Sequence, residues 1–236
     1  MQPHRIVSRA EWLVERKALL ACEKALTKAR DEVARQRREL PVVRVGKPYR
    51  FEGPDGQVSL AGLFEGRSQL IVYHFMFGAD WKEGCTGCSF LADHIDGAVV
   101  HLAQRDVTLV AVARAPLARI EAFKRRMGWR FAFLSSLGSD FNFDYGVSFT
   151  LEQLAKGEAT QNYGSSAPFG TETVGISVFY NDAGGQVFHT YSCYSRGVDM
   201  LNGAYHYLDL TPKGRDEGNQ GANPQAWVRR HDEYED

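Results

Sequence analysis

The stretch that decides the fold is Leu70–His94, with the sequence LIVYHFMFGADWKEGCTGCSFLADH. It begins as an apolar run, which predicts a strand over 69–77 that is covered on both faces of a sheet. After a short polar loop, Cys85 and Cys88 stand two residues apart, and a helical pattern over 85–104 follows. A buried strand, a loop and a helix that opens on a Cys-x-x-Cys pair are the arrangement that thiol redox proteins use.

The composition is that of a globular protein with a core of its own. The chain has 236 residues, of which 44% are hydrophobic and 24% charged, and its formal net charge is −1. That charge gives no basic excess of the kind a nucleic-acid binder shows. No window approaches the roughly 18 uninterrupted apolar residues of a membrane span, and the first residues lack the apolar core of a signal peptide. We therefore expect a cytoplasmic protein that binds neither nucleic acid nor membrane.

The first part of the chain has a long helical pattern over 8–39. Ser8 and Glu11 form the sequence signature of a capping box, and Pro41 ends the pattern. A narrow apolar stripe recurs every seven residues on this charged helix, at Trp12, Leu19, Leu26 and Val33. The stripe predicts packing against the chain's own domain or against a second subunit, and we expect a homodimer. Cys22 lies on the stripe and is interpreted as a small core residue.

The rest of the chain alternates strands and helices, which predicts a mixed α/β sheet flanked by helices. A right-handed crossover places strand 69–77 beside strand 106–113, so that their carboxyl ends face the cysteine pair. The other expected elements are a hairpin over 49–60, a helix over 116–127, a short strand over 131–134, a loop-rich region over 135–173, a hairpin formed by 173–180 and 186–194, and a helix over 197–208.

Three parts are expected from this pattern: an N-terminal helical extension over 1–44, a main domain over 45–210 and a C-terminal tail over 211–236. The tail is polar and rich in glycine, but Trp227 predicts that its end docks on the protein.

The chemistry of the cysteine pair follows from its place at the start of a helix. The helix dipole and the unpaired backbone N–H groups there stabilise a thiolate at Cys85. Cys88, one turn further along, is expected to be more buried and to attack the mixed disulfide that Cys85 forms. Gly84 and Gly87 give the backbone room for a tight turn. Cys193, on an expected strand, is interpreted as structural.

Other interpretations of the pair stay open at this point. A Cys-x-x-Cys can be half of a zinc site, for which His74 and His94 are the nearest further ligands. His74 lies in an apolar strand, which is typical of a core histidine, and His94 lies about 13 Å of helical rise beyond Cys85. The pair can also be inert. Trp81 either covers the thiols or packs, and Arg114 either binds an anion or is a surface charge.

These residues resemble known families. The region 49–208 is similar to the thioredoxin-like superfamily, especially its peroxiredoxin side, through LIVYHF, DVTLVAVARAP and ISVFYNDAGGQVFHTY. More closely, FMFGADWKEGCTGCSFLAD, SDFNFDYGVSF and LNGAYHYLDLTPKGRDE resemble a bacterial thioredoxin-like family catalogued as a domain of unknown function, of the DUF-899 type. This resemblance covers nearly the whole chain, and it implies a thioredoxin-like fold.

The chain departs from these families at two places. Peroxiredoxins carry Pro and Thr or Ser seven and three residues before the reactive cysteine, where this chain has Gly78 and Lys82. Thioredoxins carry a cis-proline before the strand that faces the cysteines, and here Thr173 or Val174 takes that place. The expected catalytic residues are Cys85 and Cys88, with no metal ligand. The residues expected to bind substrate are Trp81, Thr86, Gly87, Arg114, Thr173 and Val174.

Three functional hypotheses follow. The first is a thiol oxidoreductase without a cofactor, which exchanges disulfides or reduces a small oxidised substrate and has a thiol reductant or a disulfide substrate as partner. The second is a protein of the same fold that binds a metal or small ligand through Cys85, Cys88 and a histidine, without redox turnover. The third is an interaction scaffold with idle thiols, in which the long helix and the region 135–173 serve dimerisation.

Overall fold

The computed structural model describes residues 4–217 and 223–235, and it divides the chain into two compact units, 1–41 and 42–236. The division into 1–44, 45–210 and 211–236 stays a prediction.

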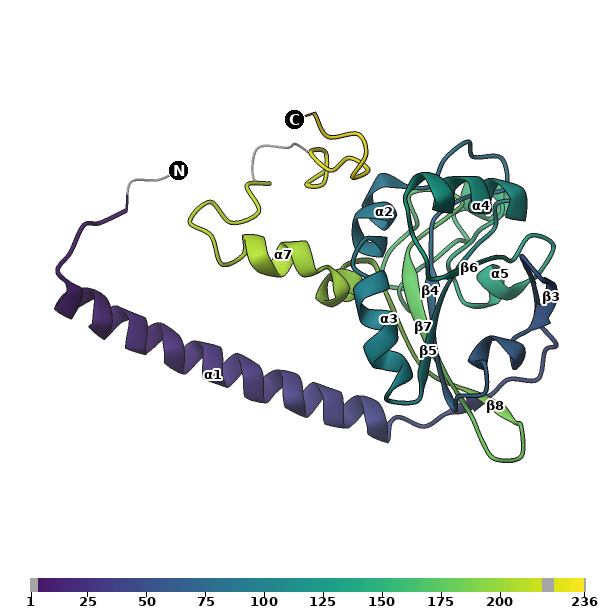
Figure 1. Cartoon of the computed structure of the whole chain (residues 1–236), viewed down its shortest axis with the longest axis horizontal. Coiled ribbons are helices and arrows are strands. Elements are labelled where there is room, and N and C mark those ends of the chain that lie inside the picture. Colours follow the sequence, from purple (N-terminus) through teal and green to yellow (C-terminus); the bar gives the residue numbers. More distant parts are fainter. Residues whose placement is uncertain (1–3, 218–222, 236) are drawn as a thin grey trace. The chain divides into compact units, whose positions relative to one another are not determined.

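The first unit is the helix α1 (Arg9–Glu39), drawn in purple in Figure 1. Ser8 caps it, and Glu11 closes the capping box that the sequence predicts. None of its residues is buried, and Cys22 is exposed. The interpretation of Cys22 as a core residue is therefore wrong, because a single helix cannot cover its own apolar stripe.

The second unit is built on a mixed sheet in the order β1-β8-β7-β4-β5-β6-β2-β3. Its strands are β1 (Val43–Arg44), β2 (Arg50–Gly53), β3 (Gly56–Ser59), β4 (Gln69–His74), β5 (Val107–Ala113), β6 (Ala132–Ser135), β7 (Gly175–Asn181) and β8 (Val187–Tyr194). The helices around it are η1 (Gly62–Phe64), α2 (Thr86–Ala92), α3 (Asp96–Ala103), α4 (Leu117–Arg126), α5 (Phe141–Asp144), α6 (Leu151–Lys156), η2 (Ser195–Leu201) and α7 (Gly203–Leu208).

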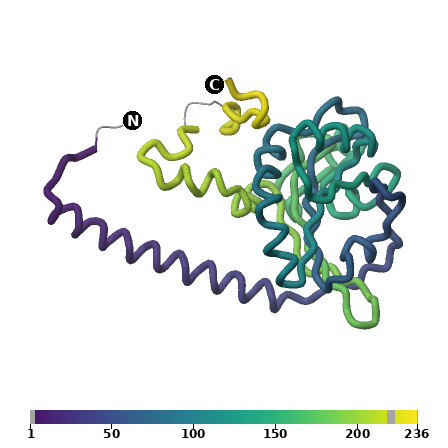
Figure 2. Tube along the Cα trace, viewed as in Figure 1, coloured from purple at the N-terminus to yellow at the C-terminus, as the bar shows by residue number. Residues whose placement is uncertain are grey.

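The strand β4 lies at the centre of this sheet. It pairs in parallel with β5, with Ile71 opposite Leu109, and antiparallel with β7, with Ile71 opposite Val178. The chain leaves β4, passes through α2 and α3 and returns into β5, a path that the Cα trace follows in Figure 2. The strand order β8-β7-β4-β5, with the cysteine helix directly after β4, is the thioredoxin-like arrangement, which confirms the expected fold class and the predicted neighbours of β4.

Alternating side chains of β4 supply the two cores of the domain, one on each face of the sheet. Tyr73 belongs to a cluster with residues of α2 and α4, such as Ile120. Leu70 and Val72 point the other way, into a cluster with Phe141 of α5. Burial of one such large side chain contributes about 1.5–3 kcal/mol. The strand that leads into the Cys85 loop is therefore held by buried side chains on both of its faces.

The expected helix over 85–104 is broken in two, into α2 and α3. The carboxylate of Asp93 accepts a hydrogen bond of 2.7 Å from the Trp129 indole, and that of Asp96 accepts from the backbone N–H groups of Arg130 (2.9 Å) and Phe131 (2.8 Å). These contacts tie the bend at 93–95 to the segment before β6. The expected helix over 197–208 is likewise two pieces, η2 and α7.

The region 135–173 holds the short helices α5 and α6 and a bridge between Ser148 and Glu172. Among the described residues, no helix has the length and apolar character that crossing a membrane requires.

Candidate thiol site

Cys85 is the residue on which α2 begins, and its backbone is held from both sides. Its N–H donates to the Met76 carbonyl over 3.0 Å, and its own carbonyl accepts from the backbone N–H and the hydroxyl of Ser89, each at 2.9 Å. The thiol itself is half-buried. Cys85 is therefore fixed at the carboxyl end of β4, the edge at which open α/β sheets bind ligands.

The turn before Cys85 requires a glycine. A Cβ atom on Gly84 would lie 2.5 Å from the ring of Phe75 and 2.7 Å from the ring of Phe123. Both rings belong to the core, so neither can move away cheaply. The sequence predicts a glycine for a tight turn here, and the structure gives the reason as close packing.

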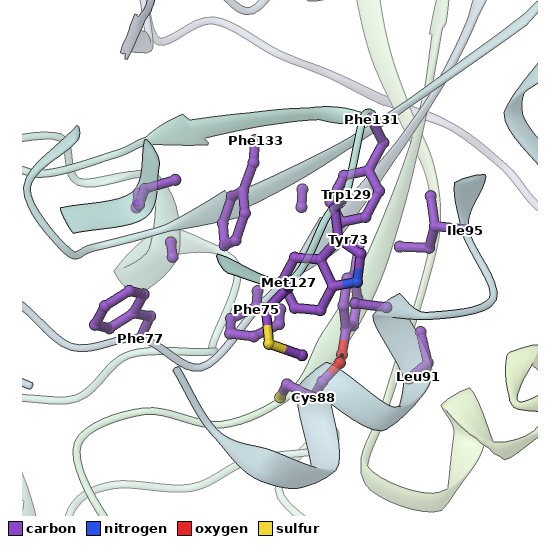
Figure 3. Close-up of a cluster of buried hydrophobic side chains, with 14 of the residues drawn as sticks. Tyr73, Phe75, Phe77, Cys88, Leu91, Ile95, Met127, Trp129, Phe131 and Phe133 are labelled. Atoms are coloured by element: carbon purple, nitrogen blue, oxygen red, sulfur yellow. Dashed lines mark hydrogen bonds between the residues drawn. The ribbon is translucent and has the colours of Figure 1, made fainter. Parts of the chain in front are cut away.

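Cys88 lies one turn further along α2 and is only 3% exposed. It belongs to the core cluster around Tyr73 and Phe75, and Figure 3 shows Cys88 at the edge of the aromatic side chains of this cluster. The Tyr73 hydroxyl donates a hydrogen bond of 3.1 Å to the Cys88 carbonyl. Cys88 is thus the buried member of the pair, and Cys85 and Cys88 are both present as thiols rather than as a disulfide.

The structure shifts the pKa values of the two thiols in opposite directions. A hydrogen bond from Cys88, helped by the backbone N–H groups of Cys88 and Gly87 and by the charge of Arg230, lowers the pKa of Cys85 to about 6 against the cost of burial. Burial, together with the neighbouring Cys85, raises the pKa of Cys88 well above its usual value. At neutral pH this arrangement favours a thiolate at Cys85 and a protonated thiol at Cys88.

The C-terminal segment contributes a charge beside this pair. Arg230 is 12% exposed, and its Nη2 donates to the Gly84 carbonyl over 2.8 Å. Its Nη1 forms ion pairs with Glu83 at 3.1 Å and with Glu233 at 2.7 Å. Its Cζ lies 5.7 Å from the centroid of the Phe123 ring. The guanidinium is therefore fixed against the residue that precedes Cys85.

The same C-terminal segment also packs against Gly87, which follows Cys85 in the chain. A Cβ atom on Gly87 would lie 2.8 Å from Oε1 of Gln225, whose amide donates to the Tyr205 hydroxyl over 2.8 Å. Val228 is buried against Phe90 of α2 and Tyr205 of α7. Docking of this part of the tail confirms what Trp227 predicts. No local sequence pattern singles out Arg230 or Gln225, because Gly84 and Gly87, against which they pack, lie more than a hundred residues away in the chain.

Two of the residues expected to bind substrate share the core cluster of Cys88. Trp81 and Val174 are partly buried and pack against it, as does Cys85. Thr86 and Gly87, in the first turn of α2, are half-buried. The structure therefore gathers these residues around the pair, while their roles in binding stay a prediction.

Arg114 and Thr173 lie at the ends of β5 and β7. Arg114 forms an ion pair with the buried Glu172 at 3.1 Å and lies over the Phe143 ring at 4.4 Å. Burial raises the pKa of Glu172, although Ser148 and Arg114 oppose the shift. The Thr173 N–H donates to the Val147 carbonyl over 2.8 Å, and its hydroxyl is buried without a hydrogen-bond partner in the described structure.

The two histidines considered as zinc ligands have other partners. His74 is buried and bonds the Ser177 hydroxyl over 2.8 Å, and burial lowers its pKa to about 3. His94 accepts from the Ala204 N–H over 3.0 Å. Within residues 4–217 and 223–235, no group of three or more Cys, His, Asp and Glu side chains is placed to hold a metal ion.

Comparison with known proteins identifies the family. The family described as "Bacterial protein of unknown function (DUF899)" matches residues 1–234, so the chain belongs to it, which confirms the resemblance seen in the sequence. No curated protein matches the chain.

Several solved structures are similar to part of the chain. Peroxidoxin BcpB from Mycobacterium tuberculosis is 15% identical, with a TM-score of 0.43, over 68% of this chain and 95% of that one. Xanthomonas campestris peroxiredoxin Q is 13% identical, with a TM-score of 0.43, over 70% and 95% of the two chains. A secreted Mycobacterium tuberculosis disulfide oxidoreductase is 16% identical, with a TM-score of 0.37, over 66% and 92%.

Proposed function

We propose that this member of the DUF899 family is a thiol–disulfide oxidoreductase, in which Cys85 is the nucleophile and Cys88 the resolving thiol. The observation that carries the proposal is the contrast within the pair. Cys85 is half-buried and its pKa is lowered, whereas Cys88 is buried in the core and its pKa is raised. An attacking thiol works best with a pKa near the ambient pH, and only the accessible thiol meets that condition.

The proposed reaction moves two electrons from the cysteine pair to a disulfide. The Cys85 thiolate attacks one sulfur of the substrate, so that a mixed disulfide forms, the substrate S–S bond breaks and one thiolate leaves. Cys88 then attacks Sγ of Cys85, and its proton passes to the second substrate sulfur as that sulfur leaves. A Cys85–Cys88 disulfide forms, and the second substrate thiol is released. A dithiol reductant returns the pair to its starting state.

The hydrogen bond between the two thiols supports this order of events. Because Cys88 donates to the Cys85 sulfur, its own sulfur lies within reach of the atom that it must attack. The Met76 backbone hydrogen-bonds Cys88 and lowers its pKa against the larger effect of burial. This group stabilises the charge that Cys88 acquires during the second step.

We assign substrate contacts to the residues that surround the pair. Trp81 and Val174 offer apolar surface, and the Thr173 hydroxyl offers a donor that no acceptor of the described residues takes. Thr86 and Gly87 border the sulfur of Cys85 along the first turn of α2. Arg114 is proposed to influence a bound substrate through its charge rather than through a direct hydrogen bond, because its guanidinium is already paired with Glu172.

Trapping of the mixed disulfide tests the proposal. The reduced protein is mixed with oxidised glutathione, and each cysteine is mapped by mass spectrometry. Wild type should pass to a Cys85–Cys88 disulfide, Cys88→Ser should accumulate glutathione on Cys85, and Cys85→Ser should not turn over. Cys22→Ser changes an exposed thiol on α1 and serves as the control with unchanged exchange. Full turnover in Cys85→Ser would refute the mechanism.

We also propose a homodimer held by α1. Trp12, Leu19, Leu26 and Val33 are all more than 40% exposed along one stripe of that helix, a pattern that pairs of helices bury between them. Leu26→Glu should shift the protein to a monomer in analytical ultracentrifugation. Lys24→Glu, on the opposite side of the helix, should leave the dimer intact. A wild-type monomer at tens of micromolar would contradict the dimer.

The cytoplasm is the proposed site of action. Four cysteines in a chain of 236 residues are too few for a disulfide framework, which suits a compartment in which thiols are kept reduced.

A further inference from the structure

The C-terminal clasp, residues 225–233, is held against the thiol helix along its length. Val228 is 2% exposed, and the Trp227 ring meets the Phe90 ring edge-on with 5.5 Å between centroids. At the far end of α2, His231 bonds the Asp93 carboxylate over 2.7 Å. Arg126 of α4 forms ion pairs with Asp232 at 2.6 Å and with Glu233 at 2.9 Å.

Within the clasp, two neighbouring arginines have different surroundings. Arg229 is exposed, and among the described residues its side chain bonds the carbonyls of Ala226 and Val228 in its own segment. Arg230 turns inward to the Gly84 carbonyl, and its Nε is buried without a hydrogen-bond partner in the described structure. A buried donor that the protein leaves unsatisfied costs free energy, so the placement of this group calls for an explanation.

The charges around the pair favour an influence of Arg230 on Cys85. Glu83 and Glu233 each pair with Arg230, and Arg126 pairs with both carboxylates in turn. Other titratable groups that face the thiols are those of Cys88 and Tyr73, and both are buried and uncharged at neutral pH. Arg230 is therefore the cation of the described residues that acts on Cys85, and it acts where water is largely excluded and charges interact more strongly.

We propose that Arg230 is a positioning residue of the thiol site, and that docking of the C-terminal clasp brings its charge to Cys85 and adds to the reactivity of that cysteine. This inference rests on the proposed function, since it assigns the control of the same nucleophile. The reactivity of Cys85 then depends on the contacts that hold the clasp against α2, α4 and α7. Displacement of the clasp lowers the thiolate population without any change in the cysteine pair itself.

The test is the pH profile of alkylation at Cys85 in the full-length protein, measured with iodoacetamide by mass spectrometry. Arg230→Gln should move the midpoint of the profile to higher pH and slow alkylation near pH 6 by about three- to tenfold, because a nearby opposite charge favours the thiolate. The plateau rate at high pH should not fall, since a less acidic thiol is the stronger nucleophile once ionised.

Matched variants separate charge from packing. Arg230→Lys keeps the charge and should restore most of the wild-type midpoint. Arg229→Gln removes a neighbouring charge from the same clasp and should leave the midpoint in place. Val228→Asp puts a charge into the apolar contact with Phe90 and Tyr205 and should reproduce the shift of Arg230→Gln, because the clasp no longer docks.

Two results overturn the inference in distinguishable ways. If Arg230→Gln and Val228→Asp exchange disulfides and keep the wild-type midpoint, Arg230 has no influence on Cys85 and only the proposed function survives. If wild-type Cys85 reacts only in the pH range of an ordinary thiol and never pairs with Cys88, the proposed function fails, and the inference fails with it.

Discussion

The guanidinium of Arg230 donates a hydrogen bond of 2.8 Å to the carbonyl of Gly84, which joins the end of the chain to the residue directly before Cys85. The bond spans 146 positions of sequence. It attaches the C-terminal clasp to the turn that sets the position of Cys85. The thiol site is therefore assembled from a local motif and from a segment that no local pattern connects to it.

The packing at Gly84 predicts a large loss of stability on a small substitution. Gly84→Ala puts a methyl group against the Phe75 and Phe123 rings, and overpacking of this kind costs about 1–3 kcal/mol of the free energy of unfolding. Gly97→Ala is the matched control. Gly97 lies in α3 with nothing within 4 Å of the added atom, so the change should stabilise the protein by about 0.5–1 kcal/mol. Urea unfolding of both variants checks the opposite signs, and equal effects would contradict the packing described.

Buried His74 predicts a dependence of stability on pH. Burial lowers its pKa from 6.5 in the unfolded chain to about 3 in the fold. Because the folded pKa is depressed, this stability is present above pH 6.5 and is lost as the pH falls towards 3. Between these values the unfolded state binds one more proton, so the slope from this group is about 1.4 kcal/mol per pH unit.

Urea unfolding at pH 7 and pH 5 measures that slope. His74→Gln keeps a polar side chain that can bond Ser177 but does not titrate in this range. The difference in slope between wild type and His74→Gln isolates the histidine, since the lowered pKa of His189 contributes to both proteins alike. Equal slopes in wild type and His74→Gln would show that the fold does not lower the pKa of His74.

The contacts of Asp93 predict that this carboxylate stabilises both the bend after α2 and the docked clasp. Its carboxylate accepts from the indole of Trp129 and bonds His231, each at 2.7 Å. Asp93→Ala leaves the buried Trp129 N–H without its acceptor, which costs about 1–3 kcal/mol. Asp93→Asn keeps an acceptor oxygen and should lose less. Thermal unfolding ranks the two variants, and a reversed order would contradict the assigned contacts.

The contact between the thiols predicts how Cys88 acts on Cys85. The hydrogen bond from Cys88 is the main reason for the lowered pKa of Cys85. Cys88→Ala removes the donor and should shift the alkylation profile of Cys85 to higher pH, whereas Cys88→Ser keeps an O–H donor and should shift it less. Identical profiles in the two variants would mean that the donor has no effect.

Local sequence patterns were sufficient for the centre of the fold. The apolar run of β4, the spacing of Cys85 and Cys88 and the capping box at Ser8 each depend on neighbours in the chain, and each was predicted. The crossover rule then placed β5 beside β4. The central strands and the helix start at Cys85 are therefore the parts of the fold that the sequence specifies most directly.

What sequence reasoning missed depends on contacts between distant parts of the chain. The break at Asp93 involves Trp129, 36 positions away, and His231, 138 positions away. Nothing in the helical pattern over 85–104 indicates those partners. Arg230 stands beside Arg229 in a charged tail, and only the fold shows which of the two faces the thiols. The exposure of Cys22 could not be predicted for the same reason, because the apolar stripe of a helix does not reveal whether another part of the protein covers that stripe.

The most direct test of the central claim is alkylation of wild-type Cys85 and Cys88 as a function of pH, followed by mapping of disulfides after mild oxidation. We predict a midpoint near pH 6 for Cys85, a much higher midpoint for Cys88, and a Cys85–Cys88 bond in the oxidised protein. Two thiols with the same midpoint at the ordinary value of about 8.5, and no bond between them, would contradict a redox pair.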